Sequence, residues 1–434
     1  VGQFTIPLMK RFGYSSIFAG AVEATSSMGG QIMPPVMGAV AFIMAETLNV
    51  PYVDIVKAAV IPAILYYVTA FWIVHLEAGR MGLVGLPKDQ CPSPMKALKE
   101  SWYLVLPLAG LVGMLFHGFT PMFAGLTGLA LTVILILGAA VAARLSGTAF
   151  RYVFWLALGL AAASFVEFGI YAILAVIALL VLLCFRVKGG RDTLRAVRLS
   201  LIDGARQALP VGVACAVVGV IIGVLTLTGA ASSFAGFILT VGEKSLFLSL
   251  FLTMIVCLIL GMGIPTIPNY IITSSIAAPA LLSLGVPLIV SHMFVFYFGI
   301  MADLTPPVAL AAFAAASIAK ASPMRIGFKA TQIAIAGFVI PYMAVYTPAL
   351  MLQGHWTVVA VLYIVGKALL AIALWGATAV GYLLAPLKIH ERVFTGIAAL
   401  MLVTAGTLSD QIGFVMAAIF IGWHVWQRRR LAVA

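Results

Sequence analysis

Oxygen-bearing side chains of this chain lie close to paired prolines in strongly apolar surroundings, where polar groups are costly and mark functional sites. Hydroxyl, amide and carboxylate oxygens ligate hard cations, and hydroxyls and amides also donate hydrogen bonds to organic anions. An acid in such a position is the sharpest candidate. The residues with this chemistry are Thr25, Ser26 and Ser27 in residues 19–45, Thr266 and Asn269 in residues 261–269, and Asp303 and Thr305 in residues 299–319.

The first apolar stretch, residues 19–45, is interrupted midway by Gly29-Gly30 and Pro34-Pro35. Proline lacks an amide donor and biases the residue before it away from helix. We expect two half-helices, roughly 15–28 and 36–47, joined by an unwound linker whose carbonyls matter more than its side chains. Such backbone is tolerated in a bilayer only where protein or a cavity surrounds it, and transporters bind substrate and ions there. The alternative is a proline-kinked packing helix.

The second stretch, residues 299–319, is likewise an apolar segment interrupted by a pair of prolines. Aligning Pro34-Pro35 with Pro306-Pro307 places Gln31 opposite Asp303. Breaks at corresponding places in two halves of a chain are the best sequence indication of a transporter site. A chance repeat is the competing explanation.

A third segment, GMGIPTIPN at residues 261–269, separates two short apolar runs within 245–284. This pattern predicts a re-entrant hairpin, whose tip must be enclosed by protein. Gly261, Gly263 and two prolines allow the chain to reverse, and the threonine and asparagine of the tip are expected to face the same cavity as the two breaks.

Composition assigns the chain to the polytopic membrane proteins. Of 434 residues, 63% are hydrophobic and 9% charged, and the mean hydropathy is +1.16. Apolar runs near helix-spanning length recur, and alternating ten-residue strands are absent, so the prediction is an all-α fold and no outer-membrane barrel. The net charge of +12 indicates cytoplasmic loops and no nucleic-acid partner. Scattered cysteines, with no phosphate loop or nucleophile–base pair, predict neither a cofactor nor an enzyme.

The distribution of Lys and Arg predicts an inverted topology. If the loop at 77–100 is cytoplasmic, then 22 of the 25 Lys and Arg residues fall on that side. The first broken segment then runs outward, the second runs inward, and the C-terminus is cytoplasmic. The expected divisions are first-repeat elements in 1–76, scaffold spans and a basic linker in 77–206, second-repeat elements in 207–351 and additional spans in 352–434.

Several motifs resemble the large permease subunit of tripartite ATP-independent periplasmic (TRAP) transporters. They are FTIPLMKRFGY and FAGAVEATSSMGGQIMPPVMGAVAFIMAE in the first half, and LGMGIPTIPNY and FVFYFGIMADLTPPVALAAFAAA in the second. The resemblance implies an inverted-repeat, elevator-type carrier in a bacterial or archaeal inner membrane. It further implies a small organic acid such as a C4-dicarboxylate, a periplasmic binding protein, here of the TAXI type, and a small membrane subunit, separate or fused upstream.

The sequence departs from that pattern at its start. The Ser/Asn-bearing tip of the first hairpin would lie just upstream of residue 1, and residues 1–10 are expected to be its returning arm. We therefore expect the chain to be part of a longer protein.

The resemblance favours sodium as the coupling ion, held by oxygens from Ser26, Ser27, Thr266, Asn269, Asp303 and Thr305. A proton would instead need Asp303, Glu23 or Glu167. The less specific interpretations are hydroxyls bonded to their own helix, Asp303 and Thr305 as caps of a half-helix starting near Pro306, and Glu23 satisfied by a neighbouring hydroxyl. The rival functions are a membrane-embedded enzyme using Asp303 and Glu23, and a channel.

Overall fold

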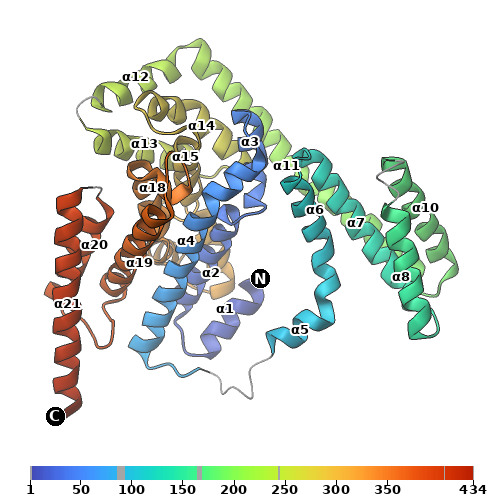
Figure 1. Cartoon of the computed structure of the whole chain (residues 1–434), viewed down its shortest axis with the longest axis horizontal. Coiled ribbons are helices and arrows are strands. Elements are labelled where there is room, and N and C mark those ends of the chain that lie inside the picture. Colours follow the sequence, from blue (N-terminus) through green and yellow to red (C-terminus); the bar gives the residue numbers. More distant parts are fainter. Residues whose placement is uncertain (1, 86–92, 164–168, 243–244, 405, 434) are drawn as a thin grey trace. The chain divides into compact units, whose positions relative to one another are not determined.

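The computed structural model of the chain describes residues 2–85, 93–163, 169–242, 245–404 and 406–433. Within these ranges the regular structure is helical, apart from one isolated β-bridge between Tyr382 and Pro386 (Figure 1). Six helices of the described part are long and apolar enough to cross a membrane, and a bent pair makes a seventh candidate. The predicted all-α polytopic membrane fold is confirmed.

The chain forms two compact units, Lys88–Val213 and the combination of Val1–Pro87 with Ala214–Ala434. We refer to the first as the insert unit and to the second as the main unit. In the insert unit α7, α8 and α10 pack around a core that includes Leu137 and Leu180. Its elements are α5 (Pro94–Ser101), a 3-10 turn (Trp102–Val105), α6 (Leu106–Phe116), α7 (Pro121–Ala142), α8 (Thr148–Ala163), α10 (Ile170–Arg186) and the first part of α11 (Gly190–Leu227).

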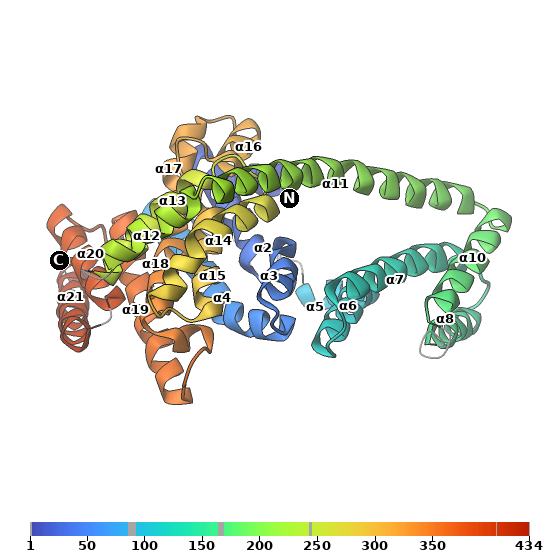
Figure 2. The same ribbon diagram turned by 90° about the horizontal axis from the view of Figure 1, so that it is seen from above.

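Helix α11 corrects one expectation. The basic stretch 186–206 was expected to be a linker before a separate span. Instead Gly190–Leu227 is one continuous helix of 38 residues (Figure 2). Its charged first half and apolar second half belong to one helix that continues through the interior Pro210, and membrane helices tolerate such a proline where the freed backbone groups find other partners. The turn predicted near Glu167 falls outside the described residues.

The main unit contains the two broken segments and the hairpin. Its first elements are α1 (Gly2–Arg11), α2 (Ser16–Ile32), the 3-10 turn η1 (Met37–Ala39), α3 (Val40–Leu48) and α4 (Tyr52–Met81). After α11 follow α12 (Ala230–Gly242), α13 (Leu246–Leu260), α14 (Thr266–Ser283), α15 (Leu288–Met301), α16 (Leu310–Ala319), α17 (Pro323–Ile333), α18 (Ile335–Tyr346), η4 (Pro348–Met351), α19 (Val358–Val380), α20 (Ile389–Val403) and α21 (Thr407–Val433).

Two of these helices differ from the sequence expectation. The sequence does not predict helix α12, because its 13 residues are too short for a membrane span. Helix α12 packs on α13, where the buried Ser249 hydroxyl donates to the Ile238 carbonyl of α12 at 2.8 Å. A span was also expected from residue 331, yet one apolar segment runs from Pro323 to Tyr346. Arg325 therefore lies on a helix and not in the loop before it.

The broken segments of the two halves pack against one another. Helix α2 of the first contacts α16 of the second and the following α17. Gly20 allows this approach, since a Cβ atom there would lie 2.8 Å from the Ile326 side chain and 3.2 Å from the Ala319 Cβ atom. Helix α1 joins the same group, because the Lys10 ammonium donates to the Ala319 carbonyl at 3.1 Å.

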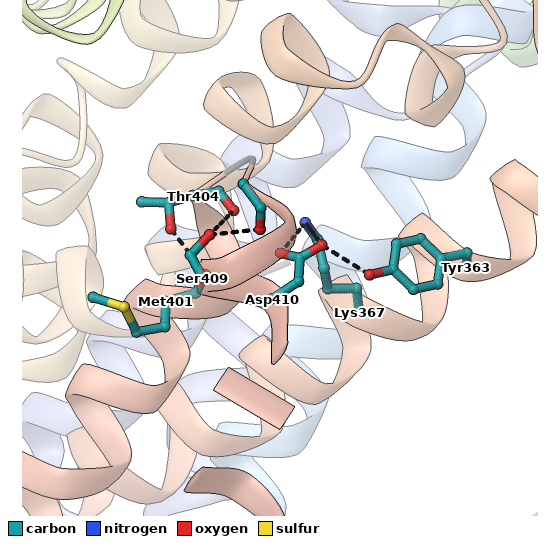
Figure 3. A network of polar contacts seen from close by, with 7 residues as sticks. Tyr363, Lys367, Met401, Thr404, Ser409 and Asp410 are labelled. Carbon is teal, nitrogen blue, oxygen red and sulfur yellow. Dashed lines mark hydrogen bonds and ion pairs between the residues drawn. The ribbon is translucent and has the colours of Figure 1, made fainter. Parts of the chain in front are cut away.

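Helices α19, α20 and α21 form the C-terminal part of the main unit, held by a buried ion pair (Figure 3). Asp410 was expected at the turn between two short spans. The turn instead precedes Thr407, and Asp410 lies in the first turn of α21. Its carboxylate accepts from the Lys367 ammonium at 2.9 and 3.1 Å and from the Tyr363 hydroxyl at 2.8 Å. The Lys367 side chain is only 3% exposed.

Removing one member of this pair is expected to destabilise the protein. A buried charge left without its partner costs about 3–5 kcal/mol, whereas replacing both charges by apolar groups is often neutral. Asp410→Leu leaves the buried Lys367 ammonium without its carboxylate and should lower the thermal unfolding midpoint of the purified protein, and Asp410→Leu combined with Lys367→Met should restore most of the loss. The exposed pair Lys57–Asp54, 3.6 Å apart, provides the control variant Asp54→Leu, which should change little. A double variant no more stable than the single one would contradict the role of charge pairing.

Candidate functional site

Helices α13 and α14 form the predicted hairpin. The connecting segment is 261–265 and not 261–269, because α14 already begins at Thr266, so Thr266 and Asn269 lie in the first turns of that helix. Gly263 turns the chain with a φ of +77°, a conformation that favours glycine. Gly261 has a different role from the one expected. It has ordinary helical dihedrals, and its missing side chain lets the tip approach α15, since a Cβ atom there would lie 2.7 Å from the Gly299 carbonyl oxygen.

Asn269 anchors this tip to α15. The side chain is buried, and its Nδ2 donates to the Gly299 carbonyl at 2.8 Å and to the Gly261 carbonyl at 3.4 Å. Its amide oxygen Oδ1 is buried without a hydrogen-bond partner among the described residues. An unpaired buried acceptor is costly, and it is available to a ligand that donates a hydrogen bond or carries positive charge.

The first broken segment bends by 63° between α2 and the helices that follow it. The break is later than expected, since α2 continues to Ile32 and α-helix resumes at Val40, after three residues with positive φ (Met37–Ala39). Gly29 and Gly30 therefore do not shape an unwound linker. Gly29 instead makes room for α4, because a Cβ atom there would lie 2.8 Å from the Tyr67 ring.

Thr25, Ser26 and Ser27 were expected where the helix unwinds, and this is wrong, since all three lie inside α2. The buried Thr25 hydroxyl donates to the Ala330 carbonyl of α17 at 3.2 Å. Ser27 lies on the exposed side and donates to Glu23 at 3.5 Å, and the Thr5 hydroxyl of α1 donates to the same carboxylate. Glu23 is thus satisfied by neighbouring hydroxyls.

Three backbone carbonyls of the first linker accept hydrogen bonds within the protein. The Pro35 carbonyl accepts from the Tyr52 hydroxyl. The Met33 carbonyl accepts from the Met37 amide at 3.2 Å, and the Val36 carbonyl accepts from the Ala39 amide at 2.9 Å. Each of these carbonyls keeps a second lone pair for another donor or a cation.

The second broken segment places an acid at the end of α15. Asp303 is 9% exposed, and its Oδ1 atom has no hydrogen-bond partner among the described residues. Its side chain does not cap the next half-helix, because α16 begins after Ala309 without a side-chain cap, although the Asp303 backbone carbonyl accepts from the Ala311 amide of α16 at 3.1 Å. The Thr305 hydroxyl is bonded back to the Met301 carbonyl at 2.7 Å and does not cap α16 either.

The two breaks share a backbone pattern in the register predicted from the sequence. Met37 and Ala309, each the third residue after the first proline of its pair, are left-handed, with φ of +48° and +42°. Both following half-helices also end on a left-handed residue, Asn49 and Lys320. The left-handed conformation is uncommon for Met, Ala and Lys, and only Asn49 adopts it readily, so the shared pattern supports an internal repeat.

The hairpin tip lies between the two breaks. The Thr266 hydroxyl donates to the Gln31 amide oxygen of α2 at 2.7 Å. A Cβ atom on Gly263 would lie 3.9 Å from the Val308 side chain, directly after the second proline pair. The alignment of the two breaks pairs Gln31 with Asp303 but does not make Gln31 a predicted site residue. Its partner Thr266 lies 235 positions away, so no local sequence pattern predicts their contact.

The structure thus assembles part of the predicted set. The tip of the outer hairpin, Asn269, Gln31 and the end of α15 with Asp303 belong to one region, whereas Ser27 and Glu23 face α1. An apolar cavity of about 750 Å³ in the insert unit is lined by residues such as Trp102, Leu131 and Trp155. It contains none of the predicted site residues, and its lining is that of a lipid-facing groove.

Comparison with known proteins fits this geometry. The family model of the tripartite ATP-independent periplasmic transporter, DctM component, matches residues 1–149 and 139–359. The chain belongs to this family. The sialic acid TRAP transporter large permease protein SiaM of Vibrio cholerae serotype O1 is 27% identical over 122 residues, which is 28% of this chain and 28% of that relative's length. The match to the DctM family includes both proline pairs and the hairpin, and it ends before α20 and α21.

Proposed function

We propose that this member of the TRAP large-permease family is the permease of an ion-driven carrier that imports a small organic acid. The observation that carries the proposal is the hairpin between two broken helices, bonded to one through Thr266–Gln31 and to the other through Asn269–Gly299. Secondary transporters bind substrate and ions at such interrupted segments. The acid is a carboxylate, a class that includes both C4-dicarboxylates and the sialic acid named for the relative.

Sodium is the coupling ion we favour. Two buried oxygens, Asn269 Oδ1 on α14 and Asp303 Oδ1 after α15, have no hydrogen-bond partner among the described residues. Thr266 adds a hydroxyl oxygen in the same segment. An oxygen set with one negative charge suits a monovalent hard cation. Ser26 and Ser27 are left out of this set, because they lie within α2 and Ser27 contacts Glu23.

The carrier works in a bacterial or archaeal inner membrane with two partners. A periplasmic binding protein of the TAXI type delivers the acid, and a small membrane subunit, separate or fused, completes the assembly. These partners follow from the family membership together with the motif resemblance. No nucleic acid is involved, and the surrounding partner of the exposed apolar side chains is the lipid bilayer.

The two broken segments are related by inversion across the membrane, and the C-terminus is cytoplasmic. The support is the bias of Lys and Arg to one side. A single cysteine replacing the exposed His355 should react with an impermeant thiol reagent in intact cells, and one replacing the exposed Lys188 should react only after lysis. Reaction of the Lys188 variant in intact cells would overturn the inverted arrangement.

A counterflow experiment distinguishes a carrier from a channel, which is the rival function that would use the same hairpin and broken segments. Proteoliposomes with the complete transporter, preloaded with unlabelled acid, should accumulate labelled acid by exchange, because a carrier reorients with substrate bound. A channel would show conductance without exchange. Ionic current with no counterflow would reject the carrier and with it the proposed function.

A further inference from the structure

The outer hairpin tip is held by two attachments, a stronger buried one and a weaker one that is partly exposed. On one side, the Asn269 Nδ2 donates to the Gly299 carbonyl of α15 at 2.8 Å, and it also donates to the Gly261 carbonyl within the hairpin at 3.4 Å. The Asn269 side chain is buried. On the other side, the Thr266–Gln31 hydrogen bond is the one side-chain bond that joins residues 261–269 to α2 and α3 within the described ranges.

The weaker attachment borders open space. A Cβ atom added to Gly30, next to Gln31, would meet nothing within 4 Å, and Gly263 and Pro265 of the tip are exposed. Within the described residues, the hydrogen bond of the Gln31 amide nitrogen goes to the Met28 sulfur at 3.6 Å, and a thioether sulfur is a weak acceptor. Thr266 and Gln31 can therefore exchange their mutual bond for water or a ligand without unpacking a core.

The strength of the bond suits a reversible attachment. A neutral hydrogen bond shifts an equilibrium by roughly threefold to tenfold. That is enough to bias the position of a short segment, and small enough for a bound ligand to reverse it.

From these observations we propose that Gln31 is a positioning residue that fastens the tip of the outer hairpin to the first broken helix, so that the tip opens only when the Thr266–Gln31 bond breaks. The proposal rests on the proposed function for its purpose, since an opening tip gives access to the site between the breaks. Its physical content is separate, because the bond and its loss can be measured without transport.

The Thr266 hydroxyl donates to the Gln31 amide oxygen, so residue 31 must accept a hydrogen bond to hold the tip. Substitutions that keep or remove the acceptor or the donor therefore test the attachment. Gln31→Met keeps the length of the side chain and removes the acceptor, whereas Gln31→Glu keeps an acceptor. Thr266→Val keeps the shape and removes the donor, whereas Thr266→Ser keeps the donor. Gln31→Glu and Thr266→Ser should therefore retain the attachment, and the other two variants should lose it.

The test measures how fast a cysteine replacing Met262 in the tip reacts with a charged thiol reagent. The full chain is purified in lipid nanodiscs, which expose both membrane faces, with its native cysteines replaced by alanine. Thr266→Val and Gln31→Met should each raise the rate roughly threefold to tenfold. Ser275→Ala, which removes an exposed hydroxyl bonded within α14, is the matched control and should leave the rate unchanged.

A double-mutant cycle excludes a merely structural effect. Residues that act through one bond are non-additive, so Thr266→Val combined with Gln31→Met should react no faster than either single variant. Wild-type rates in both single variants would overturn the proposal, and so would additive increases in the double variant. Failure of Thr266→Ser to restore the wild-type rate would also overturn it, because packing and not the hydroxyl would then hold the tip. If the proposed function were wrong, counterflow would be absent, and the labelling rates of these variants would not be affected.

Discussion

Uptake by the complete transporter is expected to fall to background when Pro34 and Pro35 are both replaced by alanine. The substitutions restore two amide donors and remove the restriction on the preceding residues, so α2 and α3 can join into one helix. The 63° bend would be lost, and with it the position of Gln31 beneath the hairpin tip. The same result is expected for Pro306→Ala combined with Pro307→Ala, and uptake of labelled acid into proteoliposomes measures both.

The control for this experiment is a proline inside a helix that continues without a break. Pro279 lies inside α14, on an exposed side of a helix that continues past it. Pro279→Ala should keep near-normal uptake. All variants should also reach the membrane in similar amounts. Normal uptake by either double variant would reduce that break to a packing kink and remove it from the site.

Asp303→Asn is expected to abolish sodium-driven uptake at ordinary sodium concentrations. The substitution keeps the size of a buried side chain and removes its charge. Opposite charges about 4 Å apart at an effective dielectric constant of ~20 attract by about 4 kcal/mol, so sodium affinity should fall by a hundredfold or more. The measurement is the sodium concentration that gives half-maximal uptake.

Glu23→Gln is the comparison for that variant. Glu23 is also an acid on a membrane helix, but hydroxyls of Thr5 and Ser27 donate to it, and it faces α1. Glu23→Gln should therefore leave the sodium dependence of uptake close to that of the wild type. An unchanged sodium dependence in Asp303→Asn, with a large change in Glu23→Gln, would move the cation site to α1 and α2.

The sequence predicted the elements whose signals are local. Two proline pairs predicted two broken helices, and glycines around GMGIPTIPN predicted the hairpin, because proline and glycine act on their own backbone. Embedded Asp303 stood out, since an acid among apolar residues needs a reason. The motif resemblance then predicted the family that the comparison shows.

The errors came from tertiary contacts. Gly29 reads as a helix breaker but is a packing glycine against tyrosines of α4, and packing keeps α2 helical through Thr25. Gln31 became a site residue only through a hydroxyl more than two hundred positions away. Lys367 on α19 forms its ion pair with Asp410, 43 positions away in the first turn of α21. Pairings of this kind depend on which helices meet, and no local pattern specifies that.

The most direct test of the account is uptake into proteoliposomes that hold the complete transporter, driven by one ion gradient at a time. Labelled sialic acid and succinate serve as the first carboxylate substrates. An inward sodium gradient without a pH gradient should drive accumulation, the reverse combination should not, and Asp303→Asn should lose the sodium response. Accumulation driven only by the pH gradient and lost in Asp303→Asn would contradict sodium coupling and make Asp303 the proton carrier. Equal uptake with both gradients collapsed would contradict an ion-driven carrier altogether.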